Sequence, residues 1–161
     1  MTIAKGDRLP VANLLKLGEG GPEAVDLSAL TAGKRVVIFA VPGAFTPTCT
    51  NAHLPSFIQT ADQFAAKGVD LVCVSVNDPF VTDAWAKATG ADKAGIAVLS
   101  DAEGAFTQAL GMDFTAPPAG LYGRSKRYAL LAEDGTVTAL HLEDSPGTCS
   151  VSGGASMLEE I

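Results

Sequence analysis

The chain has 161 residues, of which 47% are hydrophobic, and its 18 acidic and 11 basic residues give a net charge of −7 at pH 7. This length and apolar content predict a single domain over residues 1–161, because domains commonly hold about 100–150 residues around one core. The acidic balance argues against a nucleic-acid partner, since phosphate neutralisation requires concentrated positive charge.

Targeting and membrane signals are lacking in the sequence as it stands. The stretch MTIAKGDRLP has no apolar core of the kind a secretory signal needs, and no segment reaches the roughly 18 apolar residues of a membrane span. We therefore expect a cytoplasmic protein without membrane contact. Cys49, Cys73 and Cys149 are too few for a secreted disulfide scaffold and show no paired metal-ligand spacing. In a reducing compartment, an exposed thiol indicates redox chemistry.

The first predicted elements form two crossover units. Apolar runs rich in β-branched residues at 36–41 and 69–76 predict buried parallel strands. Between them, residues 47–67 place apolar side chains at helical spacing, and Pro55 is expected to kink that helix. A second helix is predicted after Asp78, an N-cap residue followed by proline. Strand, helix and strand in this order predict right-handed crossovers.

The later part of the chain predicts shorter elements. A Glu-Asp-Gly sequence between two apolar runs indicates a hairpin, because glycine supplies the positive φ of a tight turn. The predicted elements are a strand at 95–99, a helix at 101–111, a Pro- and Gly-rich loop at 112–123, hairpin strands at 128–132 and 136–142, and a helix at 155–161. Together they predict an α/β fold with a mixed central β-sheet flanked by helices.

The stretch after the first strand, PGAFTPTCT, carries the most specific chemical signal. Thr46 followed by Pro47 fits an N-cap with proline at the first helical position, which places Cys49 third in the first turn. Backbone N–H groups lack partners there, and together with the helix dipole they favour an anion. A thiolate at Cys49 would therefore be stabilised relative to a thiol.

The start of a helix alone does not stabilise a thiolate enough to make it the main form of Cys49 near pH 7. A free cysteine is only a few per cent thiolate near pH 7. The dipole contributes about 0.3–1 kcal/mol, up to ~2 in partly buried sites, and a hydrogen bond to a charged group contributes about 1.5–3 kcal/mol. We therefore expect a fixed cation beside the thiol, and the candidates are Arg124, Lys126 and Arg127.

Four segments of the chain resemble one known family. PGAFTPTCTNAHLPSF, at 42–57, resembles the active-site motif of peroxiredoxins, Pro-x-x-x-Thr-x-x-Cys, and in particular the atypical two-cysteine type II group. VCVSVNDPFVTDAW at 72–85, SKRYALLAEDG at 125–135 and GTCS at 147–150 resemble segments of that group in the same order. The resemblance implies a thioredoxin-like fold and thiol-dependent reduction of hydrogen peroxide and alkyl hydroperoxides.

The resemblance also implies roles for individual residues. Cys49 would be the peroxidatic cysteine, Pro42 and Thr46 would shape its pocket, and Arg127 would supply the guanidinium. Oxidation of Cys49 would give a sulfenic acid, which condenses with a second thiol to a disulfide. Cys149, in a loop with glycines on both sides, matches the resolving position of animal-type members, and we favour it over Cys73, which lies in a buried strand and matches a position used by plant-type members.

The same resemblance implies the partners. We expect a hydroperoxide substrate, a reductant that is thioredoxin or glutaredoxin with glutathione, and a homodimer. No bound metal, haem, flavin or nucleotide is expected.

Other functions and roles stay open. A cysteine hydrolase would use Cys49 with His53 or His141, although a packing role is the simpler interpretation of His53. A redox-sensing or holdase-like protein would react slowly with peroxide or without turnover. Acidic residues such as Glu143 and Asp144 are interpreted as a solvated surface that aids solubility.

Overall fold

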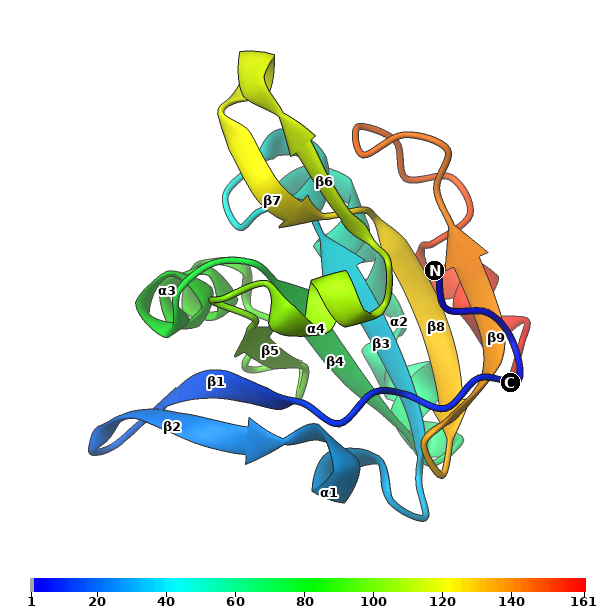
Figure 1. Ribbon diagram of the computed structural model, residues 1–161. Helices are drawn as coiled ribbons and strands as arrows, with labels where there is room; N and C mark the ends of the chain where they lie inside the picture. The colour runs from blue at the N-terminus through cyan, green and yellow to red at the C-terminus, as the bar shows by residue number, and fades with distance from the viewer. Residues whose placement is uncertain (1) are drawn as a thin grey trace.

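The computed structural model describes residues 2–161 and consists of a twisted sheet with helices on both faces, together with a separate β-ribbon (Figure 1). The strands are β1 (Asn13–Gly18), β2 (Gly21–Asp26), β3 (Arg35–Val41), β4 (Val69–Ser75), β5 (Ala97–Ser100), β6 (Asp113–Ala116), β7 (Leu121–Ser125), β8 (Tyr128–Glu133) and β9 (Thr136–Leu142). The helices are α1 (Leu27–Thr31), the π-helix η1 (Cys49–His53), α2 (Leu54–Ala66), α3 (Pro79–Thr89), α4 (Ala105–Ala109), the 3-10 helix η2 (Pro117–Ala119) and α5 (Gly154–Leu158).

The main sheet is mixed, as the sequence predicts. Within the described residues it has seven strands in the order β2-β1-β5-β4-β3-β8-β9. Strands β3, β4 and β5 are parallel and are joined by the crossover helices α2 and α3, whereas β1, β8 and β9 pair antiparallel with their neighbours. This arrangement confirms the two crossover units and the hairpin. The hairpin turn has φ of 50° at Asp134 and 79° at Gly135.

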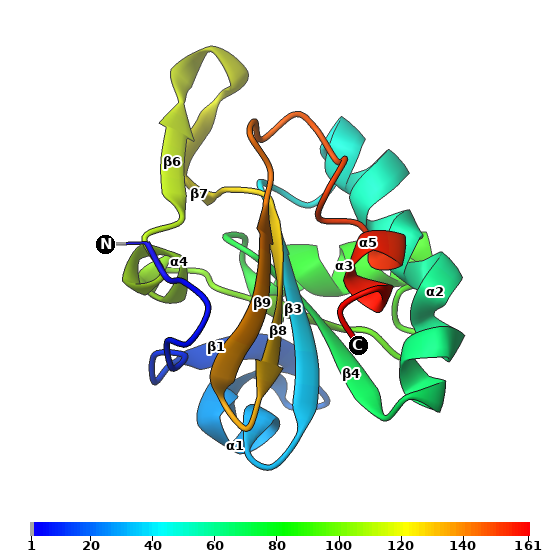
Figure 2. The same cartoon turned by 90° about the vertical axis from the view of Figure 1, so that its right-hand side faces the viewer.

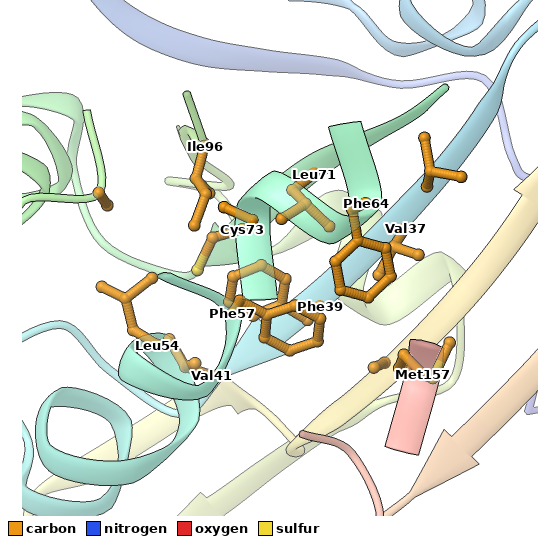
Figure 3. Close-up of a cluster of buried hydrophobic side chains, with 14 of the residues drawn as sticks. Val37, Phe39, Val41, Leu54, Phe57, Phe64, Leu71, Cys73, Ile96 and Met157 are labelled. Atoms are coloured by element: carbon orange, nitrogen blue, oxygen red, sulfur yellow. The ribbon is translucent and has the colours of Figure 1, made fainter. Parts of the chain in front are cut away.

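The central strands β3, β4 and β8 are buried on both faces, because α2, α3 and α5 cover one face and α4 lies on the other (Figure 2). Side chains of β3 alternate between two buried clusters: Val37, Phe39 and Val41 in one, and Val36, Ile38 and Ala40 in the other. In the first cluster the Phe39 ring stacks on Phe57 of α2 with a centroid distance of 3.9 Å (Figure 3). This stack fixes α2 against the centre of the sheet.

The prediction of a loop at 112–123 is wrong. Strands β6 and β7 form an antiparallel ribbon over most of this range, with a register shift between Phe114 and Ala116. The two prolines occupy η2 at the tip of the ribbon, so they do not remove ladder hydrogen bonds from either strand. The ribbon projects from the body of the protein (Figure 1).

Residues 13–31 also form structure that was not predicted from the sequence. Strands β1 and β2 pair antiparallel around a turn next to Gly20, and Leu14 of β1 is fully buried. β1 extends the main sheet beyond β5 through a single residue pair, Leu15 with Ser100. The short, mostly exposed β2 gives only a weak alternating pattern, which explains why the sequence did not reveal it.

The helix predicted at 47–67 is present, with a local change of pitch. It widens into the π-helical turn η1, in which the Leu54 N–H bonds to the Cys49 carbonyl five residues earlier. Pro55 then occupies the first turn of α2, where its missing N–H is tolerated. The distortion thus lies before Pro55 and includes Cys49. Across residues 2–161, no helix has the length and apolar character required to cross a membrane.

The contact of α5 with α2 gives a stability prediction. Gly154 begins α5, and a Cβ added there would overlap the Ser56 carbonyl and the Thr60 hydroxyl of α2. Gly154→Ala is therefore expected to lower the free energy of unfolding by about 1–3 kcal/mol in urea titrations, since the backbone of α2 cannot give way. The control is Gly20→Ala, because no atom lies within 4 Å of its added Cβ. Equal stability of the two variants would contradict this packing.

Candidate active site

A strained turn leads from β3 into the helix that carries Cys49. Phe45 in this turn has φ of 64°, a conformation that non-glycine residues rarely adopt. A residue beyond the end of a second strand also holds this turn, because the Ala44 N–H donates to Asn77 Oδ1 at 3.0 Å. Asn77 follows β4, so the carboxyl ends of β3 and β4 together fix the start of the helix.

Helical structure begins at Pro47, which makes Cys49 the third residue of the first turn, as predicted. Thr46 occupies the N-cap position, and its carbonyl accepts from the Thr50 N–H at 3.0 Å. Its hydroxyl, however, donates to the Gly43 carbonyl at 2.7 Å and makes no side-chain cap. The hydroxyl proton is therefore committed, and the oxygen keeps lone pairs that can accept a hydrogen bond.

Arg127 is the cation that the structure brings to the thiol. Its side chain is only 2% exposed, and Nη2 donates to Cys49 Sγ at 3.1 Å. Nε and Nη2 also donate to the Pro146 carbonyl at 3.1 and 2.9 Å, and Nη1 lies 3.0 Å from His53 Nδ1. Within residues 2–161, no carboxylate forms an ion pair with this guanidinium. Its buried charge is thus directed at the sulfur.

The other two candidate cations do not contact the sulfur. Arg124 lies in β7 and donates to the Pro42 carbonyl at 3.3 Å, which ties the ribbon to the turn before the helix. Lys126 follows β7, and its backbone N–H bonds to the Met112 carbonyl. The position of these residues in the sequence did not distinguish the three, because only the fold determines which side chain points inward, and the choice of Arg127 came from the family resemblance.

His53 is fully buried and holds Arg127. Its Nε2 lies 2.9 Å from the Ser152 carbonyl, which can only accept, so Nε2 carries the proton and Nδ1 accepts from Arg127 Nη1. Burial, reinforced by the Arg127 charge, lowers the pKa of His53 to about 3. The imidazole is therefore neutral near pH 7, and its lone pair faces Arg127. The local sequence does not reveal this role, because a packing histidine has the same pattern.

The cysteine hydrolase interpretation lacks a base in this arrangement. The free lone pair of His53 is occupied by Arg127. His141 is held elsewhere, with Nδ1 at 2.7 Å from the Val151 carbonyl and Nε2 at 3.1 Å from Glu160 Oε1. In the described part of the chain, neither histidine forms a hydrogen bond with Cys49.

The three cysteines are free and lie in different environments. Cys49 and Cys73 are fully buried, and Cys73 of β4 packs in the first core cluster, where burial raises its pKa well above the usual range (Figure 3). Cys149 is partly exposed, and burial raises its pKa while the Arg127 charge opposes that effect. The Cys149 loop lies against the helix start, because Thr48 Oγ1 donates to the Gly147 carbonyl at 3.0 Å.

A cavity of about 320 Å³ opens beside Arg127 and Thr46. Pro42 contributes to its lining, and Phe114 and Leu121 of the β6–β7 ribbon supply part of an apolar wall. This wall could not be predicted while residues 112–123 were expected to form a loop. Within residues 2–161, no group of three or more His, Cys, Asp or Glu side chains is arranged to bind a metal ion.

Glu143 is not the solvated surface acid that the sequence suggests. It is 6% exposed, and its carboxylate accepts hydrogen bonds from the backbone and hydroxyl groups of residues 150–152. Burial alone would raise the pKa of Glu143, but these hydrogen bonds outweigh it and lower the pKa to about 2. Asp144, by contrast, is exposed as expected.

Comparisons with known proteins agree with this geometry. The profile of the Redoxin family matches residues 4–158. The chain is 48% identical to peroxiredoxin-2E-2, chloroplastic, of Oryza sativa subsp. japonica, over 99% of this chain and 73% of that protein. It is 44% identical to peroxiredoxin-2E, chloroplastic, of Arabidopsis thaliana, over 99% of this chain and 70% of that protein. The crystal structure of reduced Prx3 in complex with H2O2 from Vibrio vulnificus has a TM-score of 0.90 and 45% identity, with 99% of both chains covered.

These relatives correct one expectation. The cytoplasmic location predicted from the sequence is wrong by this comparison, because both plant relatives are chloroplastic proteins. Targeting signals are addresses read by receptors and are separate from the fold, so the residues of the sheet and the site carry no information about location.

The buried neutral His53 gives a pH prediction. Below its ordinary pKa of 6.5 the unfolded chain binds a proton at this residue, whereas the folded protein does not until the pH approaches about 3. Stability should therefore fall as the pH is lowered, by about 2 kcal/mol between pH 7.5 and pH 5, since each unit is worth about 1.4 kcal/mol.

Urea unfolding at these two pH values measures the effect in the wild type and in His53→Gln. The variant cannot titrate at this position, and it should lose correspondingly less stability on acidification. An identical loss in both proteins would contradict the neutral, buried state of His53.

Proposed function

The chain belongs to the Redoxin family and, within it, to the type II peroxiredoxins, which are thiol peroxidases, and from this premise we propose how its residues divide the reaction. The observation that carries the proposal is the 3.1 Å contact between Arg127 Nη2 and Cys49 Sγ at the start of a helix. The guanidinium donates directly to the sulfur, where it can stabilise the negative charge that develops in the reaction.

Cys49 is the proposed nucleophile. Its thiolate attacks one oxygen of the hydroperoxide, an S–O bond forms as the O–O bond breaks, and the leaving oxygen takes up a proton to give water or an alcohol. Cys49 is oxidised to a sulfenic acid and the peroxide is reduced. Arg127 donates to the negative charge that develops on the reacting oxygens, and it is already in place because His53 and Pro146 hold it.

Thr46 and Pro42 are proposed to orient the substrate. The Thr46 hydroxyl donates a hydrogen bond to the Gly43 carbonyl, so its oxygen is available to accept a hydrogen bond from the peroxide O–H. Pro42 lines the same cavity as Thr46 and Arg127. The apolar wall of this cavity suits the alkyl group of an organic hydroperoxide.

Cys149 is the proposed resolving cysteine. Its thiol attacks the Cys49 sulfenic sulfur, and a disulfide forms with loss of water. Three features support it over Cys73: partial exposure, a position in a loop that contacts the helix start, and the deep burial of Cys73 within the sheet. The resulting disulfide is returned to thiols by an external thiol reductant.

We further propose that this reductant is thioredoxin, or glutaredoxin with glutathione. We also propose that each chain forms a single domain over residues 1–161 and that two chains form a homodimer. The family resemblance supports the homodimer, and Phe45, Phe80 and Tyr122 are large exposed side chains that a subunit interface could cover. Sedimentation velocity of the reduced protein distinguishes a dimer from a monomer.

Mass spectrometry with disulfide mapping tests the assigned roles. After one equivalent of hydrogen peroxide, the reduced wild type is expected to contain a Cys49–Cys149 disulfide, because Cys149 is the accessible second thiol. Cys149→Ser should instead accumulate a Cys49 sulfenic acid, which a dimedone adduct traps.

Cys73→Ser is the matched control and should form the same Cys49–Cys149 disulfide as the wild type. A Cys49–Cys73 disulfide in the wild type would transfer resolution to β4. An unmodified Cys49 would remove the peroxidase assignment of this residue, as would slow peroxide consumption without turnover, which the redox-sensor alternative predicts.

A further inference from the structure

The carboxylate of Glu143 fastens the segment that follows Cys149. Oε2 accepts from the backbone N–H groups of Ser150, Val151 and Ser152 at 2.9, 2.9 and 2.7 Å and from Ser152 Oγ at 2.6 Å, while Oε1 accepts from Ser150 Oγ at 3.0 Å. Within residues 2–161, no basic side chain forms an ion pair with it. Three consecutive residues are thus held by one buried acid.

This segment touches the site through Ser152. Glu143 holds the Ser152 backbone and hydroxyl, and the Ser152 carbonyl accepts from His53 Nε2. That contact fixes the proton on Nε2 and directs the Nδ1 lone pair to Arg127 Nη1. Arg127 in turn donates to Cys49 Sγ. A continuous series of hydrogen bonds therefore runs from the Glu143 carboxylate to the sulfur.

Glu143 is also bound to Arg127 along the backbone. The Glu143 N–H donates to the Arg127 carbonyl at 3.0 Å, so the two residues lie side by side at the ends of β8 and β9. The loop between Glu143 and the fastened segment supplies the Pro146 carbonyl, which accepts from Arg127 Nε and Nη2. The guanidinium is thus supported from two sides by one loop, which is anchored at Glu143.

We propose that Glu143 is a positioning residue for the peroxide step, whose carboxylate holds Ser152 and thereby His53 so that Arg127 stays directed at Cys49. This inference rests on the proposed function, because it explains how the assigned roles of Arg127 and Cys49 are maintained. Glu143 itself touches neither the sulfur nor the cavity that opens beside Arg127 and Thr46.

Removal of the Glu143 charge changes the rate of Cys49 oxidation in opposite directions for a positioning role and for a purely electrostatic role. A negative charge near the site disfavours a thiolate, so removing it would speed the reaction if Glu143 acted only through its field. Removing a positioning residue slows the reaction instead, because Arg127 is no longer held in its donating geometry. A purely structural role would change the stability and leave the rate of the folded protein unchanged.

The experiment measures the first step alone in the full-length chain. A Cys149→Ser parent prevents resolution, and stopped-flow fluorescence of Trp85 follows oxidation by hydrogen peroxide. Trp85 is the single tryptophan and donates to Thr50 Oγ1 within η1 at 3.1 Å. The second-order rate constant of the parent is compared with those of Glu143→Gln and of Asp144→Asn, which removes the same charge from an adjacent exposed side chain.

Glu143→Gln is expected to lower the rate constant about tenfold or more, as for loss of one hydrogen bond to a charged group, whereas Asp144→Asn should stay within about twofold of the parent. An unchanged or faster Glu143→Gln overturns the inference. If Glu143→Gln does not fold, Ser152→Ala and His53→Leu test the same series of hydrogen bonds at the residues between Glu143 and Arg127. His53→Gln, which keeps a donor and an acceptor, should lose less than His53→Leu, and equal losses in the two overturn the inference.

The reaction of the Cys149→Ser parent with hydrogen peroxide shows whether a negative result bears on the positioning role of Glu143 or on the peroxidase function. A parent that reacts rapidly while Glu143→Gln matches it overturns the positioning role alone. A parent that does not react with peroxide removes both.

Discussion

The contact between the Arg127 guanidinium and the Cys49 sulfur is the interaction around which the candidate active site is arranged. A guanidinium that is 2% exposed and lacks a carboxylate partner within residues 2–161 is costly to bury. Neutral acceptors, the Pro146 carbonyl and the His53 imidazole, satisfy its N–H groups without cancelling its charge. The charge therefore remains available to the sulfur, and the buried position strengthens its effect there.

The fold brings distant segments together to maintain this contact. β3 leads through a strained turn into the helix start, and the widened turn η1 presents Cys49 and His53 to the same guanidinium. Arg127 arrives from the other side of β3, at the start of β8. The loop after β9 then closes over Arg127 and carries Cys149. The nucleophile, the cation and the proposed resolving thiol thus share one small region while they are separated by up to a hundred residues in the chain.

Short sequence motifs correctly predicted the features that depend on the backbone preferences of neighbouring residues. The Thr-Pro pair fixed the helix start and the place of Cys49, and the Asp-Gly turn revealed the hairpin, because both depend on the backbone preferences of adjacent residues. The β6–β7 ribbon was missed because its prolines lie at the tip and not in the strands. The burial of Glu143 was missed because its donors come from another segment, and an acid with such donors has the same sequence pattern as a solvated one.

The most direct test of this account is the second-order rate constant for oxidation of Cys49 by hydrogen peroxide in Arg127→Gln, with Lys126→Gln as a control of equal charge change. We expect a loss of about 10- to 100-fold for Arg127→Gln, the range for one hydrogen bond to a charged group, and little change for Lys126→Gln. Equal rate constants in the two variants would contradict this role of Arg127, because the 3.1 Å contact would then contribute nothing beyond the shared change in net charge.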